Sequence, residues 1–87
     1  MSNDYIFQTK ADEEAAIARY ASKTALGVRQ LYANLRQDVN AVPATEIYDE
    51  CRDEAYDILV QRESVHGDLV DLILIDVTEA AVALVLG

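Results

Sequence analysis

The segment EIYDECRDEAYDIL, residues 46–59, decides how this chain folds, because it separates apolar from acidic residues at the spacing of an α-helix. Its apolar residues recur every three or four positions, which places them on one helix face; they are Ile47, Cys51, Ala55, Ile58 and Leu59. Four carboxylates follow a different face, at Glu46, Glu50, Asp53 and Asp57. The pattern predicts a helix over about residues 45–63, which begins after Pro43 with Thr45 as its N-cap and buries one side only.

A longer helix is predicted before this segment, over residues 11–38. Thr9 is suited to cap it, and three acids follow at positions 12–14, where the helix dipole favours anions. Apolar or small residues then alternate at spacings of 4 and 3 as one stripe: Ile17, Ala21, Thr24, Val28, Leu31 and Leu35. Gly27 lies beside the stripe, where a missing side chain permits close helix approach. Residues 1–9 have no helical period and are predicted to form a short arm, with a strand as the alternative.

A third helix is predicted over residues 68–86, after a turn at HGD, residues 66–68. Its acids form a narrow polar stripe, and nearly everything else is apolar; the acids are Asp68, Asp71, Asp76 and Glu79. The β-branched residues also admit a strand, but the acid spacing and the following TEAAVAL favour a helix. We expect a homodimer with this helix or the 11–38 helix in the interface, because two small neighbours cannot cover so wide an apolar arc. The alternative is a monomer that wraps this helix tightly.

The predicted fold is therefore all-α: a three-helix antiparallel bundle with a short N-terminal arm, forming one domain over residues 1–87. The composition agrees, since 52% of residues are hydrophobic and 26% are charged, as in globular proteins. The single cysteine excludes an internal disulfide, and a reducing, cytoplasmic location is the simplest expectation. A membrane span is not expected, because acids interrupt the apolar residues 69–86.

Net charge is −9, and all of it lies in residues 44–87, which hold eleven acids and two bases. Residues 1–43 hold five of each. Direct nucleic-acid binding by the acidic half is disfavoured, because phosphates repel it. A basic protein surface or a divalent metal ion is the favoured class of partner.

The carboxylates can be interpreted first as metal ligands, because Mg²⁺ prefers hard oxygen donors. DEAYD at 53–57 and DLVDLILI at 68–75 resemble the two acidic helix motifs of the MazG-like, all-α nucleoside-triphosphate pyrophosphatases, and VRQLYANLR at 28–36 is similar to the segment before the first motif. The resemblance covers about residues 28–87. It implies hydrolysis of a nucleotide between its α and β phosphates, with Mg²⁺ held by five carboxylates: Asp53, Glu54, Asp57, Asp68 and Asp71.

The leading interpretation is an acidic binding surface without catalytic residues. Cys51 stands on the apolar face, and His66 is the single candidate base for a Ser or Cys nucleophile, so nucleophilic catalysis has little support. The sequence also contains no glycine-rich phosphate loop. The proposed binding residues are Glu46, Asp49, Glu50, Asp53 and Asp57. A helical rise of about 1.5 Å per residue spaces carboxylates one turn apart by roughly 4.5 to 6 Å, against roughly 3.4 Å per charge on a DNA strand.

This surface predicts a small interaction or inhibitor protein that binds a basic surface of a nucleic-acid-binding host protein. Small acidic helical proteins of phages and mobile elements, of the anti-restriction and anti-CRISPR type, act in this way, some as DNA mimics. The alternative to a binding surface is a solvated face that confers only solubility.

Overall fold

The computed structural model describes residue 7, residues 9–65 and residues 67–87. Three α-helices occupy most of them: α1 (Lys10–Asn34), α2 (Ala44–Asp57) and α3 (Gly67–Leu86). A short 3-10 turn, η1 (Val39–Ala41), follows α1, and a π-helical turn, η2 (Ile58–Arg62), continues α2. No strand occurs among the described residues, so the all-α prediction is confirmed for them. The predicted arm lies mostly outside the described residues, although Phe7 packs against the core.

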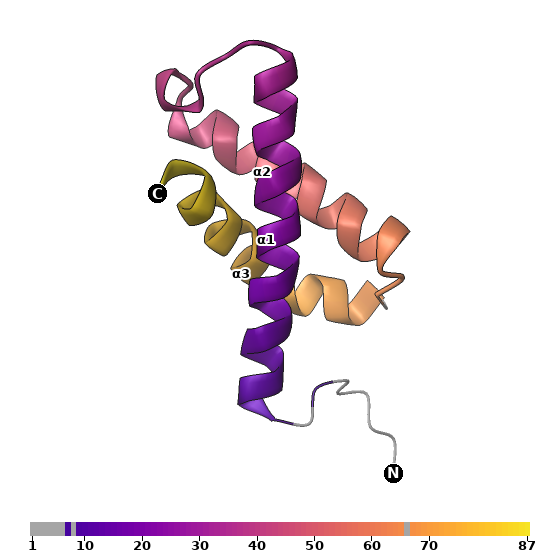
Figure 1. Ribbon diagram of the computed structural model, residues 1–87. Coiled ribbons are helices and arrows are strands. Elements are labelled where there is room, and N and C mark those ends of the chain that lie inside the picture. The colour runs from indigo at the N-terminus through magenta and orange to yellow at the C-terminus, as the bar shows by residue number, and fades with distance from the viewer. Residues whose placement is uncertain (1–6, 8, 66) are drawn as a thin grey trace.

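The helices cross one another obliquely (Figure 1). α2 and α3 run in opposite directions and lie on the same side of α1, which is left open on its other side. The molecule is elongated, with extents of 50 × 23 × 17 Å. The predicted number of helices is confirmed, but the regular antiparallel bundle is not, because α2 and α3 do not align with α1.

The core forms where the three helices meet. The whole predicted apolar face of the second helix is buried, from Ile47 to Leu59, each residue at 0% exposure. Small residues of α1 pack against it and against α3, and they are joined by two tyrosines, Tyr20 and Tyr32. Two buried hydroxyls are satisfied within their own helices: Thr24 donates to the carbonyl of Tyr20 at 2.8 Å, and Thr78 donates to that of Leu74 at 2.7 Å.

The stripe predicted along the first helix is partly wrong. Ala21, Thr24 and Val28 are buried as expected, but Leu31 and Leu35 are 38% and 57% exposed. Their places in the core are taken by other residues of α1: Ala16, Tyr20, Ala25 and Tyr32. Alanines allow α1 to approach its neighbours closely, so the buried face follows the small residues rather than the leucines.

α1 also ends earlier than predicted, at Asn34 instead of residue 38. Arg36 adopts a left-handed conformation with φ of 56°. The amide of Gln37 donates to the carbonyl of Tyr32 at 2.9 Å, and that of Arg36 donates to Ala33 at 3.0 Å. These two bonds form a Schellman motif, whose left-handed position is usually glycine. Because this position holds an arginine, the sequence lacks the usual glycine signal for the end of the helix.

The second helix begins at Ala44, within a residue of its predicted start. The prediction that Thr45 caps this helix is wrong. The N-cap position is Pro43, whose carbonyl accepts hydrogen bonds from the amides of Glu46 and Ile47. At the other end, the amide of Glu63 donates to the carbonyl of Ile58 at 2.8 Å, five residues back. This wider π turn lets Ile58 and Leu59 both face the core.

Replacing Arg36 by glycine is expected to stabilise the protein by about 1 kcal/mol, because a left-handed residue with a side chain costs about 1–2 kcal/mol. Chemical denaturation measures the free energy of unfolding. Gln37→Gly is the matched control, since Gln37 has no left-handed backbone to relieve and should gain nothing. Equal effects of the two substitutions would contradict the assigned helix end.

Candidate functional site

The carboxylates of α2 form one outward surface, here called the acidic face: Glu46, Asp49, Glu50, Asp53 and Asp57. Four of them are exposed, and Glu50 is half-buried. None belongs to the buried side of α2, which consists of Ile47, Cys51 and Ala55. The structure therefore places all five predicted binding residues on the solvent side of α2, where the fold does not need their charge.

Few cations of the protein neutralise the acidic face. Asp57 lies 3.8 Å from Nε of Arg62, across the π turn. The hydroxyl of Tyr32 donates to Oε2 of Glu46 at 3.4 Å, a long contact. Within the described part of the chain, no Lys or Arg forms an ion pair with Asp49, Glu50 or Asp53. Three carboxylates thus remain available to an external cation.

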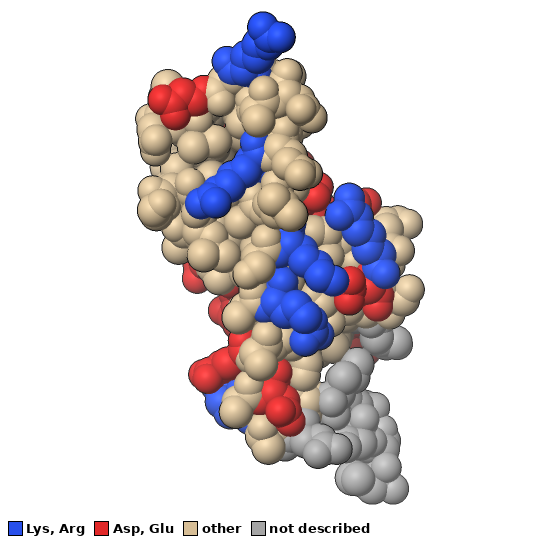
Figure 2. Space-filling model, in the orientation of Figure 1, with Lys and Arg blue, Asp and Glu red and all other residues tan. Residues whose placement is uncertain are grey.

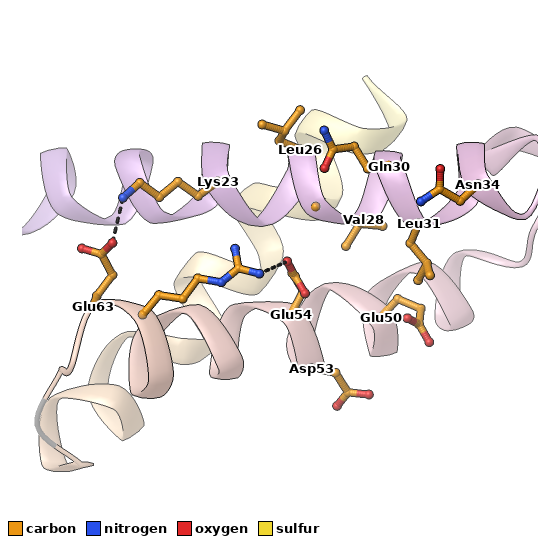
Figure 3. A pocket seen from close by; sticks show the side chains of 12 residues that line it. Lys23, Leu26, Val28, Gln30, Leu31, Asn34, Glu50, Asp53, Glu54 and Glu63 are labelled. Carbon is orange, nitrogen blue, oxygen red and sulfur yellow. Dashed lines mark hydrogen bonds and ion pairs between the residues drawn. The ribbon is translucent and has the colours of Figure 1, made fainter.

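A groove of about 640 Å³ lies between α1 and α2, and Glu50 and Asp53 of the acidic face line it. Figure 3 shows Lys23 above Glu63, and Glu54 and Glu50 along the α2 wall. Nζ of Lys23 lies 2.8 Å from Oε2 of Glu63, and Nη2 of Arg62 lies 3.9 Å from Oε2 of Glu54. The groove therefore has a largely acidic wall along α2, and the α1 wall is apolar and amide-rich with one cation, Lys23.

Gly27 permits the close approach of α1 and α2 that its position predicted. A Cβ atom there would lie only 2.2 Å from Oε2 of Glu54. The Glu54 carboxylate therefore rests on the backbone of α1, inside the groove. The direction of the Glu54 side chain matters because Glu54 was predicted to bind a metal ion together with carboxylates of the third helix.

The five carboxylates of the pyrophosphatase alternative are not brought together. Glu54 lies in the groove beside α1, and Asp57 lies beside Arg62. Asp53, Asp68 and Asp71 are exposed. Among all described residues, no group of three or more acids, histidines or cysteines is placed to hold a metal ion. The cluster of carboxylates that the resemblance implied is therefore not formed in this arrangement of the helices.

The outer side of α1 has the opposite charge from the acidic face. Residues 15–37 contain four cations and no acid: Arg19, Lys23, Arg29 and Arg36. Figure 2 shows Lys and Arg side chains gathered along the middle and upper part of α1, with most acids toward the margins of the view. The groove was not predicted from the sequence. The basic character of this side of α1 is visible in the sequence as the absence of acids over 23 residues.

Three side chains have displaced pKa values: two buried in the core, Cys51 and Tyr32, and one in the groove, Glu63. Burial, with the nearby Glu50 and Glu54 charges, raises the pKa of the Cys51 thiol to about 11. Burial and the charge of Glu46 also raise the pKa of Tyr32. The hydrogen bond from Lys23 lowers the pKa of Glu63, so this pair stabilises the fold at neutral pH. Its contribution to stability is lost as pH falls through that lowered pKa.

No protein-family model, curated protein or solved structure matches this chain. None of the described helices combines the length and apolarity needed to cross a bilayer.

The Cys51 thiol should make unfolding pH-dependent at high pH. Its pKa of about 11 exceeds its ordinary value of 9.0, so ionisation favours the unfolded chain. Stability is unaffected below pH 9 and falls as pH rises, by up to about 1.4 kcal/mol per pH unit for one group. We expect Cys51→Ala to have a flatter stability profile than the parent between pH 9 and 11.

Tyr32→Phe serves as the control, because it removes the tyrosine titration and keeps the slope due to Cys51. At pH 8, native parent protein should also resist thiol reagents until it unfolds, since Cys51 is 0% exposed. Rapid labelling of folded protein at pH 8 would show that the thiol is not buried.

Proposed function

We propose that this protein is a small acidic interaction protein, and that the acidic face of α2 binds a basic surface of a nucleic-acid-binding protein. One observation carries the proposal: five carboxylates share the solvent side of a helix whose other side is fully used by the core. A face that served folding alone would not need them. Three of the five have no internal cation within the described residues, so they are free to pair with a partner.

The physical basis of binding is electrostatic. The acidic face lies in the half of the chain that holds the whole net charge of −9, so it attracts cationic surfaces over distances near the Debye length. Surfaces that bind nucleic acid are rich in Lys and Arg, and the acidic face offers them a row of carboxylates roughly 4.5 to 6 Å apart, against roughly 3.4 Å between the charges of one DNA strand. Binding at the same surface would block the nucleic acid, which is inhibition by mimicry.

The pyrophosphatase alternative requires the carboxylates of α2 and α3 to meet around Mg²⁺. Among the described residues they do not form such a group, so this arrangement offers the pyrophosphatase reaction no Mg²⁺ site.

The test compares two variants that reduce the net negative charge equally, from −9 to −5. The first neutralises the acidic face through Glu46→Gln, Glu50→Gln, Asp53→Asn and Asp57→Asn. The matched control neutralises four exposed acids elsewhere, through Asp12→Asn, Glu14→Gln, Asp68→Asn and Asp71→Asn. Proteins retained from a lysate by the immobilised parent are identified, and their affinities for the three forms are measured.

We expect the acidic-face variant to lose at least about tenfold in affinity, mainly through slower association, while the control keeps most of it. Duplex DNA should compete with the parent for the same partner, and added salt should weaken the complex. Equal losses in both variants would mean that only net charge matters. Unchanged binding of the acidic-face variant, or failure of DNA to compete, would contradict the proposal.

A further inference from the structure

The side of α1 that borders the groove exposes apolar surface. Leu26 is 59% exposed and Leu31 is 38% exposed, and both line the groove between α1 and α2. Exposed leucines grouped beside a cavity are typical of contact surfaces rather than of a solvated helix. The charges around these leucines indicate which partner fits.

Five residues share this side of α1 at spacings of 4, 3, 4 and 4: Arg19, Lys23, Leu26, Gln30 and Asn34. Figure 3 shows the last four along α1, with the side chains of Leu26 and Gln30 on the edge of α1 that is farther from α2. The two cations are in the N-terminal half of this stripe, and the two amides are in its C-terminal half, with Leu26 between them. A second α1 running antiparallel would therefore set cations against amides and leucine against leucine.

The wall of α2 adds the complementary charge. The contact between Tyr32 and Glu46 places the C-terminal half of α1 beside the N-terminal half of α2. Glu50 lines the groove there, together with Leu31 and Asn34, and has no ion pair among the described residues. A cation that arrives opposite Asn34 therefore meets a half-buried carboxylate without a partner.

We propose that a second copy of this chain docks along this side of α1, beside the groove, with its α1 antiparallel to the first. An axis of two-fold symmetry beside Leu26 brings the two Leu26 side chains together and sets Lys23 of each copy opposite Gln30 of the other. Arg19 of the second copy then lies opposite Asn34, within reach of Glu50. Symmetry repeats each contact, so the interface closes at two copies.

A foreign basic helix is the other occupant that this charge pattern admits. The second copy fits better, because the stripe is complementary to itself under the two-fold rotation: no acid lies on it, and neither cation faces another cation. This inference goes beyond the proposed function and fails separately from it, since self-association is measured on the purified protein alone.

Sedimentation equilibrium on the purified protein gives the first test. We expect a mass of twice 9.6 kDa in the micromolar range. A mass of 9.6 kDa throughout that range would overturn the proposal.

Cross-linking locates the interface. Leu26→Cys, oxidised with glutathione disulfide, should give a covalent dimer, and the native thiol does not interfere because Cys51 is buried. Ile75→Cys is the matched control, since Ile75 is 58% exposed on α3, away from the groove. Faster cross-linking at position 75 than at position 26 would move the interface to α3 and reject this one.

Charge exchange tests the predicted contact between Arg19 and Glu50. Arg19→Glu and Glu50→Arg should each weaken the dimer by about tenfold, and the double variant should recover most of the loss. Recovery excludes simple misfolding, because both single changes remain in the double variant. Additive losses without recovery would contradict the contact. A monomeric parent that instead binds a basic helical peptide in the groove would assign the groove to a foreign partner.

Discussion

The apolar side chains of α3 have partners on one side only, and the positions of the other helices follow from covering that side. Seven residues of α3 are buried: Leu69, Val70, Ile73, Val77, Thr78, Ala81 and Val85. α1 meets them with alanines and tyrosines, and α2 meets them with its one apolar face. Burial of about 25 cal/mol per Å² of apolar surface is the main force available to so small a chain. The oblique crossing lets both helices share the same buried face.

Charge is distributed as a consequence of this packing. Once Ile47, Cys51 and Ala55 face inward, the helical period directs the acids of α2 outward. The acids of α3 likewise lie opposite its buried side, while α1 keeps an outer surface without acids from residue 15 to residue 37. The molecule therefore has an acidic side and a basic side, joined at the groove. Both proposed interactions use this separation: a foreign basic surface on the acidic face, and a second copy along α1.

The sequence predicted the fold where periodicity and capping agree. The apolar face of α2 is confirmed residue by residue, and Thr9 caps α1 by accepting from the amide of Asp12 at 3.1 Å. The prediction failed where the local signal was absent or misleading. Arg36 takes a conformation that usually requires glycine, and Leu31 and Leu35 look like core residues by size.

The site was predictable only in part. The acidic face follows from the spacing of its carboxylates along one helix. The groove depends on how two helices cross, which the local pattern does not encode. The proposed metal ligands depend on the same crossing: motif spacing within each helix does not determine whether Glu54 faces α3 or, as found, Gly27 of α1.

The burial of one side of α3 is tested most directly by comparing Ile73→Ala with Ile75→Ala. The two isoleucines are two positions apart, and their exposures are 1% and 58%. Denaturant unfolding should show a loss of about 2–5 kcal/mol for Ile73→Ala, because the truncation leaves a cavity. The loss for Ile75→Ala should be within about 0.5 kcal/mol, as for other surface positions. Equal losses, or a larger loss at position 75, would mean that α3 faces the other way and would contradict the fold on which both interactions depend.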